Sequence, residues 1–270
     1  MNREEKIKKL NNAEHYSFDD LLTVMELLRA PGGCPWDAEQ THESIREGLI
    51  EETYEVIEAI DNGDRDLLCE ELGDVLLQVV FHAQIEREAG VFDISNVLDG
   101  ICSKLIHRHP HVFGEISVEN SDEVLVNWDK IKSEEKKRET LSSKLRSIPR
   151  QLPALMRAEK VGKKAKCFDF KDADEVLAKL EEEKLEVIEA ASIGDRDKIE
   201  EEIGDLLLTV TSLCRKLDVK PENALNRATD KFINRFELIE TELSQKGLSP
   251  ENLTMAELDS IWDKNKSKNQ

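Results

Sequence analysis

The sequence has 270 residues, a length that fits two domains of ordinary size. Asp and Glu number 58 against 38 Lys and Arg, and the formal net charge of −20 argues against a nucleic acid polymer or an anionic membrane as the main partner. With 39% apolar and 36% charged residues, the composition is typical of a helix-rich soluble protein and excludes a disordered or collagen-like chain.

The first half of the chain reads as a series of helices. Apolar residues at helical spacing predict a helix over Phe18–Arg29, two helices within 49–60 and 72–80, and another over Ile94–Arg108. The Asp-Asn-Gly-Asp sequence at 61–64 ends one helix and can cap the next, so the middle two helices are expected to form an antiparallel hairpin.

The second half repeats this order. Helices are predicted over Asp172–Ala191, Pro221–Ser244 and Thr254–Lys266, and Ile193–Asp195 marks the turn of a second hairpin. No run of alternating apolar and polar residues predicts a strand anywhere in the chain. The predicted fold class is therefore all-α.

An internal duplication relates the two halves. Residues 51–77 and 182–208 align without a gap at an offset of 131, and 17 of the 27 positions are identical. The offset is far longer than the period of a solenoid, so it indicates tandem copies of one helical-bundle domain. We expect a first domain over 1–132, a polar linker over 133–150 and a second domain over 151–270.

The cysteines and the apolar stretches bear on the cellular compartment. The five cysteines are scattered, with no Cys-x-x-Cys pair, which predicts reduced thiols rather than disulfides or a zinc ribbon. The N-terminal residues lack the apolar core of a signal peptide, and apolar stretches such as Val75–Phe81 are far shorter than the roughly 18 residues of a membrane span. The sequence thus predicts a cytoplasmic protein that does not enter a membrane.

Both copies carry the same two acidic motifs. Glu-Glu-x-x-Glu lies on the first helix of each hairpin and Glu-x-x-Asp on the second. Residues three apart share a helix face, so an antiparallel hairpin can bring the two motifs opposite each other. The residues are Glu51, Glu52, Glu55, Glu71 and Asp74 in the first copy, and Glu182, Glu183, Glu186, Glu202 and Asp205 in the second.

Carboxylates that face one another repel, and a divalent cation removes that penalty. An all-oxygen ligand set suits Mg²⁺, with Mn²⁺ as a substitute, and does not suit Zn²⁺. A di-iron centre would need Glu-x-x-His, but Val79 stands three residues before His82 and the second hairpin has no histidine. A solvated acidic helix face is the ordinary alternative for one such motif, and its fixed partner in both copies favours a metal site.

Further motifs accompany the acidic ones. They are Cys34-Pro35-Trp36-Asp37 with Gln40-Thr41-His42, Arg108-His109-Pro110-His111-Val112-Phe113, and Ile148-Pro149-Arg150-Gln151-Leu152-Pro153-Ala154-Leu155. With these motifs and the acidic ones, the chain resembles the MazG family of nucleoside triphosphate pyrophosphohydrolases in its two-domain form, from about Phe18 to Lys266. One departure is Cys-Phe-Asp-Phe at 167–170, where the family pattern has Gly-Phe-Asp-Trp.

The resemblance implies tandem all-α domains, a homodimer, and Mg²⁺-dependent conversion of an NTP or dNTP to its monophosphate and pyrophosphate. It implies that a metal-activated water attacks the α-phosphorus. The residues implied as metal ligands and catalytic groups are Glu183, Glu186, Glu202 and Asp205, with a possible second metal site at Glu52, Glu55, Glu71 and Asp74. Those implied to line the nucleotide site are Lys179, Glu182, Lys198, Lys231, Arg235, Trp262 and Lys266.

Two lysines distinguish the copies. At the offset of 131, Lys179 aligns with Gly48 and Lys198 with Leu67, so only the second copy has a cation one turn before each acidic motif. Lysines are suitable point charges for a triphosphate. The second copy is therefore expected to carry most of the turnover, and the first to serve in dimerisation or regulation with at most weak activity of its own.

Alternatives remain open at this point. A non-catalytic nucleotide sensor or scaffold, acting through a partner, would bind NTP without turnover, and an acidic interaction protein would show no response to Mg²⁺. Trp262 can stack on a base or anchor a core, and Lys231 with Arg235 can form a solvated helix edge. Stacking discriminates bases weakly, so activity on several NTPs and dNTPs is expected.

Overall fold

The computed structural model describes residues 1–135, 140–249, 251 and 253–266, with the side chains of 125, 129, 130, 132–135 and 264–266 left undescribed. Within these residues every regular element is helical, which confirms the predicted all-α class. None of the described helices is both long and apolar enough to cross a membrane.

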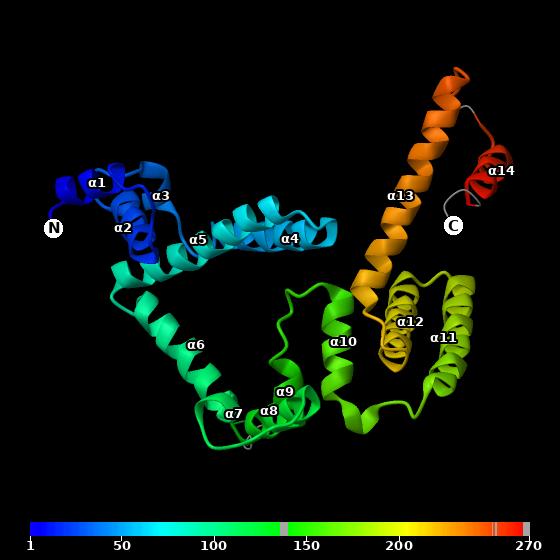
Figure 1. The fold of residues 1–270 in the computed structure, drawn as a ribbon. Helices are drawn as coiled ribbons and strands as arrows, with labels where there is room; N and C mark the ends of the chain where they lie inside the picture. The colour runs from blue at the N-terminus through cyan, green and yellow to red at the C-terminus, as the bar shows by residue number, and fades with distance from the viewer. Residues whose placement is uncertain (136–139, 250, 252, 267–270) are drawn as a thin grey trace. The chain divides into compact units, whose positions relative to one another are not determined.

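The chain divides into two compact units, Met1–Lys136 and Lys137–Gln270. The division falls inside the segment 133–150, in which α9 (Leu141–Arg146) forms a short helix. Figure 1 shows the helices of each unit in chain order.

The first unit is built around one long hairpin and the helices that flank it. Helix α5 is the common element, since α2, α4 and α6 all pack against it. The helices of this unit are α1 (Arg3–Asn11), α2 (Phe18–Arg29), α3 (Pro35–Glu39), α4 (Arg46–Asn62), α5 (Arg65–Ala89), α6 (Ile94–Arg108), α7 (Pro110–Phe113) and α8 (Ser121–Glu135).

The second unit contains the second hairpin, formed by α11 and α12. Helix α10 packs against both α12 and α13, and α14 packs against α13. After α9, the helices of this unit are α10 (Ala154–Lys164), a 3₁₀ turn (Lys166–Phe168), α11 (Ala173–Ile193), α12 (Arg196–Lys216), α13 (Pro221–Gln245) and α14 (Met255–Lys266).

The two hairpin turns use the same residues in the same roles. Gly63 and Gly194 end α4 and α11 with φ of 68° and 78°, a left-handed conformation that glycine adopts without steric cost. Asp64 and Asp195 then cap the next helix, each accepting two backbone N–H groups from its first turn. The duplicated sequence therefore produces the same tight reversal twice, which fixes how the acidic motifs face each other.

The predicted helices are confirmed with small shifts at their ends. Phe18–Arg29 and Ile94–Arg108 have the predicted bounds. Helix α11 starts one residue later than predicted because the Asp172 side chain accepts the N–H of Glu175 and so acts as the N-cap. It also continues two residues further, to Ile193, because Gly194 is the residue that stops it.

Each unit has its own small core. In the first, Met25 of α2, Ile45 before α4, and Val80 and Phe81 of α5 form a buried cluster. In the second, the fully buried side chains include Val176, Ile239 and Leu243. Many other apolar side chains of the hairpins remain exposed to solvent in the single chain.

Candidate functional site

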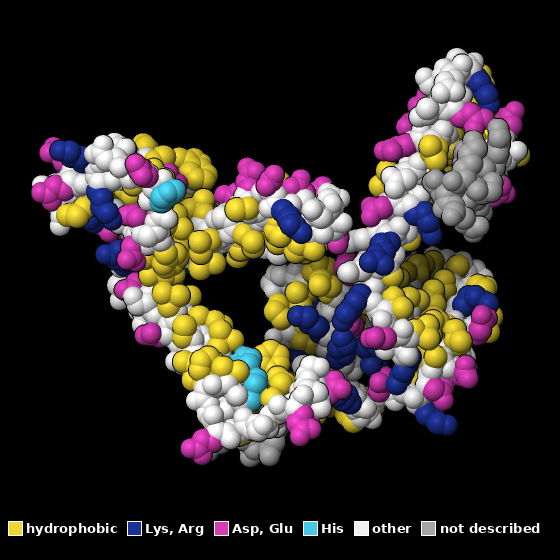
Figure 2. Space-filling view, viewed as in Figure 1, with side chains coloured by type: hydrophobic (Ala, Val, Ile, Leu, Met, Phe, Trp, Pro, Cys, Tyr) yellow, Lys and Arg dark blue, Asp and Glu magenta, His cyan; other side chains and the backbone are white. Residues whose placement is uncertain are grey.

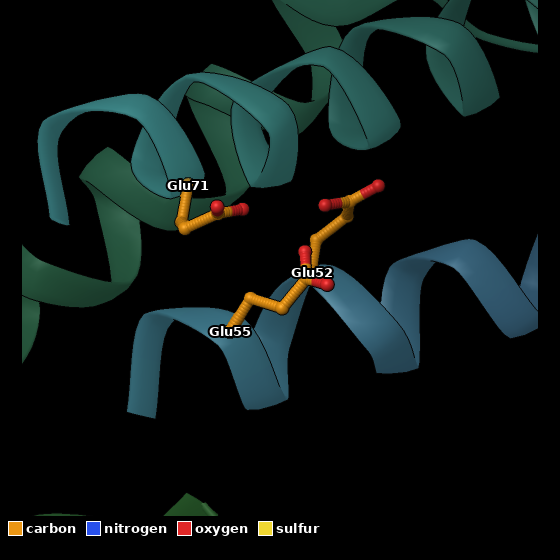
Figure 3. A group of neighbouring side chains, drawn as sticks. All are labelled: Glu52, Glu55 and Glu71. Carbon is orange, nitrogen blue, oxygen red and sulfur yellow. The ribbon is translucent and has the colours of Figure 1, made fainter. Parts of the chain in front are cut away.

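The first hairpin gathers three of its predicted ligands. Glu52 and Glu55 project from α4 toward α5, and Glu71 approaches them from α5 (Figure 3). One carboxylate oxygen from each residue lies within 4.8 Å of the others. Glu71 is buried, whereas Glu55 is exposed, so the group opens to solvent on one side.

The second hairpin gathers the equivalent residues. Glu183 and Glu186 of α11 and Glu202 of α12 also offer oxygens that all lie within 4.8 Å of one another. These positions are related to the first group by the offset of 131, and Glu183 is buried. The duplicated sequence has thus built two matching carboxylate clusters.

The fourth predicted ligand of each copy lies apart from its cluster. Asp74 and Asp205 stand one turn after Glu71 and Glu202, and neither joins the 4.8 Å group. Asp74 is nevertheless close enough to Glu52 and Glu71 to raise the pKa of both. The hairpin therefore supplies three converging carboxylates and a fourth within one helical turn.

The first cluster holds its charge poorly without a counter-ion. Burial is the main cause that raises the pKa of Glu52, followed by the charge of Asp74. Burial also raises the pKa of Glu71, followed by the charge of Glu55. Both shifts have the cause expected where carboxylates are brought together and partly removed from water.

A lysine offsets part of the negative charge in the second cluster. The Lys179 ammonium donates to Glu182 at 2.8 Å and lies 3.1 Å from Glu183, and these two contacts raise the pKa of Lys179. Burial still raises the pKa of Glu186, with the charges of Glu183 and Glu202 adding to it and Lys179 opposing it. One cation therefore offsets part of the repulsion, and the cluster remains short of positive charge.

The equivalent place in the first hairpin contains no cation. Gly48 occupies the position of Lys179, and a Cβ atom there would lie 2.8 Å from the side-chain nitrogen of Gln78. A glutamine side chain therefore occupies this space, and it would have to move aside for a lysine at 48. The first cluster thus has a neutral amide where the second has the Lys179 ammonium.

The donor set fits a hard divalent cation. Each cluster offers only oxygen ligands, some of them with raised pKa values, and a bound cation would favour their ionised form. Mg²⁺ and Mn²⁺ prefer such ligands and keep room for water and phosphate oxygens. This chemistry is suited to phosphate substrates rather than to redox reactions.

The other residues predicted to line the nucleotide site lie on three helices of the second unit, α11, α12 and α13, and at the end of α14. Lys198 is exposed in the first turn of α12, one turn before Glu202. Lys231 is exposed on α13. Glu182 is exposed and is engaged by Lys179. Lys266 ends α14, and its side chain lies outside the described residues.

Trp262 is placed by packing between the last two helices. Its ring lies 5.0 Å from that of Phe232 and 5.7 Å from the Arg235 guanidinium, both on α13. The first copy repeats the arrangement, with Arg108 at 6.0 Å from the ring of Trp128. An arginine–tryptophan contact present in both copies joins the terminal helix to its neighbour, so Trp262 has a structural role whether or not it also meets a base.

Sequence reasoning missed an ion-pair cluster behind the second hairpin. Arg215 donates to Asp169 through both terminal nitrogens, at 3.1 and 2.7 Å, and Lys216 also reaches Asp169 at 3.0 Å. These donors hold the pKa of Asp169 down to about 2. The Cys-Phe-Asp-Phe segment at 167–170 is thereby fixed to the end of α12. Only the motif itself hinted at this, because its partners lie 46 and 47 residues away.

Comparison with known proteins identifies the family. The MazG nucleotide pyrophosphohydrolase domain matches the chain twice, over residues 40–113 and 171–238. Each matched segment contains one hairpin and its carboxylate cluster.

Two of the curated relatives match over almost their whole length. The nucleoside triphosphate pyrophosphohydrolase/pyrophosphatase MazG of Thermotoga maritima is 47% identical over 92% of this chain and 95% of its own. The nucleoside triphosphate pyrophosphohydrolase of Escherichia coli K12 is 45% identical over 90% of this chain and 95% of its own. The Bacillus subtilis protein YabN is 40% identical, with this chain covering 52% of its length. Two matched domains, each with its carboxylate hairpin, and relatives at 45–47% identity that are covered over 95% of their length place this chain in the MazG family of nucleotide pyrophosphohydrolases.

Proposed function

We propose that this chain hydrolyses nucleoside and deoxynucleoside triphosphates to monophosphates and pyrophosphate in the cytoplasm, in a reaction that depends on Mg²⁺ or Mn²⁺. The observation that carries the proposal is the second carboxylate cluster, where Glu183, Glu186 and Glu202 converge beside Lys179. The names of the Thermotoga maritima and Escherichia coli relatives support the reaction class.

In this proposal the cluster, with Asp205 one turn away, holds the divalent cation. Bound there, the cation would supply charge neutralisation for the phosphates and a more acidic water. Lys198 and Lys231 contribute positive charge to the triphosphate, and the exposed position of both leaves them accessible to it. The carboxylates act mainly by positioning, since a triphosphate needs little covalent help from the protein.

The reaction is tested by incubating the protein with each NTP and dNTP, with Mg²⁺ or with a chelator, and separating the products. We expect monophosphate and pyrophosphate from several bases, and none in the chelator. Preferences among bases should be modest, below roughly 10⁴-fold, because stacking and phosphate-binding cations discriminate bases weakly. Formation of diphosphate and phosphate would contradict the proposal that the bond between the α- and β-phosphates is cleaved. Binding without turnover would favour the sensor alternative.

We further propose that the protein is a homodimer that covers the apolar faces of its hairpins. On α11, Leu185 and Ile188 are 62% and 56% exposed, and on α12 Leu207 is 50% exposed. Apolar side chains gather visibly on this hairpin in Figure 2. The first hairpin also exposes apolar side chains, among them Ile57 and Ile60 of α4. Contiguous apolar surface on this scale marks an interface.

A second copy is the proposed occupant because both hairpins of one chain expose such a face. Light scattering after size exclusion should give twice the 30.8 kDa mass of the chain. Ile60→Glu on the first hairpin together with Leu185→Glu on the second should lower that mass to one chain, whereas Met255→Glu on the terminal helix should not. A monomeric wild type would remove the proposal. In this scheme the first domain, 1–132, serves dimerisation or regulation and 151–270 carries catalysis.

A further inference from the structure

A pair of histidines meets in the first unit, away from the carboxylate cluster. His42 lies in the turn before α4, and His82 lies in the second half of α5. Their rings lie 15° from parallel with centroids 5.0 Å apart, and their Nδ1 atoms are 2.7 Å apart, within hydrogen-bond distance. On the other side of the His42 ring, Nε2 lies 2.7 Å from a carboxylate oxygen of Glu86, one turn after His82.

Glu86 determines which nitrogen of His42 carries the proton. An ionised carboxylate only accepts hydrogen bonds, so Nε2 of His42 must be the donor. In the neutral imidazole this leaves a lone pair on Nδ1, which accepts the Nδ1–H of His82, and a cation would take the place of that proton. Metal-binding histidines are commonly oriented in this way, with one ring nitrogen bonded to a carboxylate and the other free for the cation.

His82 is also suited to be a ligand. It is half-buried, and its Nδ1 atom lies 2.7 Å from that of His42. Neutral imidazole is the form that binds metals. Because His82 lies within α5, the helix holds its backbone in place.

We propose that His42 and His82 bind a transition-metal cation of the Zn²⁺ type through their Nδ1 atoms, with Glu86 orienting His42 and water completing the coordination. Imidazole nitrogen suits Zn²⁺, whereas the carboxylate clusters suit Mg²⁺, so the two kinds of site select different cations. In a tetrahedral site with Zn–N bonds of about 2.0–2.1 Å the two nitrogens stand about 3.4 Å apart. The two nitrogens would need to separate by less than about 1 Å, and the rings would need to turn so that both lone pairs point at the cation.

The site would tie two distant parts of the first unit together. His42 and His82 are 40 residues apart, and the segment that bears His42 is already held in place by Arg29, which donates to the backbone oxygen of Gln40 at 3.2 Å. A cation can bridge the two histidines only in the folded state, because only the fold brings them together. Its binding therefore stabilises the fold of the first unit.

The test uses the full chain in excess Mg²⁺, which occupies the carboxylate clusters, and titrates it with Zn²⁺ by calorimetry and thermal melting. We expect one Zn²⁺ per chain, bound below about 100 µM, and a higher melting temperature. His42→Gln and His82→Gln should each abolish this binding. Glu86→Gln should weaken it by about 10- to 100-fold, as loss of an orienting carboxylate does.

His15→Gln is the matched control, because His15 is an exposed histidine of the same unit and should leave the binding unchanged. If His82→Gln perturbs folding, Glu86→Gln still decides the question, since that side chain is partly exposed and only orients the ligand. Zn²⁺ binding that survives both histidine changes, or no binding by the wild type in this range, would overturn the proposal.

Discussion

Glu186→Gln is expected to lower kcat/KM for triphosphate hydrolysis by about 100-fold or more, whereas Glu55→Gln is expected to leave most of the activity. Removing one oxygen ligand from the second cluster forfeits several kcal/mol of charge stabilisation in the transition state, and each 1.36 kcal/mol is about tenfold in rate. Glu55 is the equivalent residue in the first cluster, whose hairpin has Gly48 and Leu67 where the second has its two lysines.

The pair is matched in chemistry and in position, so a general effect of losing a surface carboxylate appears equally in both variants. Product formation should be measured for each at saturating Mg²⁺, with melting curves to show that both remain folded. A large loss in Glu55→Gln together with a small loss in Glu186→Gln would reverse the assignment of the catalytic copy.

The second large effect is on stability. Asp169→Ala should lower the free energy of unfolding of the second unit by about 3 kcal/mol, because it leaves the charge of Arg215 nearly buried and without its partner. The Arg215 side chain is only 10% exposed, and its Nε atom is buried without a hydrogen bond. Urea denaturation at neutral pH, followed by a probe in the second unit, measures the change.

Lys184→Ala is the control for this prediction. Lys184 forms an ion pair with Glu181, but the two side chains are 55% and 71% exposed, and such pairs contribute less than about 1 kcal/mol. Equal decreases in the free energy of unfolding in the two variants would show that the Asp169 contacts stabilise the fold no more than an exposed ion pair does.

The same ion pair predicts a dependence on pH. The folded-state pKa of Asp169 is about 2, below its ordinary value of 3.8. A lowered acid pKa contributes stability that is present above 3.8 and is lost as the pH falls toward 2. The difference in the free energy of unfolding between the wild type and Asp169→Ala should therefore be smaller at about pH 3 than at neutral pH.

The sequence by itself determined the local structure. Helix ends follow from capping residues and glycines, as at Asp64, Gly194 and Asp172, because these interactions form between neighbours in the chain. The duplication and the spacing of the acidic motifs also predicted that each hairpin brings carboxylates together. A tight turn fixes the register of two antiparallel helices, so the convergence of Glu183, Glu186 and Glu202 is nearly a local property.

Only the tertiary structure decided the rest. The spacing did not show that Asp205 stands outside the 4.8 Å cluster, because that depends on how the helices are rotated about their axes. Nor did it pair Asp169 with Arg215, or His42 with His82, since these partners are 46 and 40 residues apart. Such contacts depend on how helices pack, and packing is set by many weak interactions acting together rather than by a pattern of neighbouring residues.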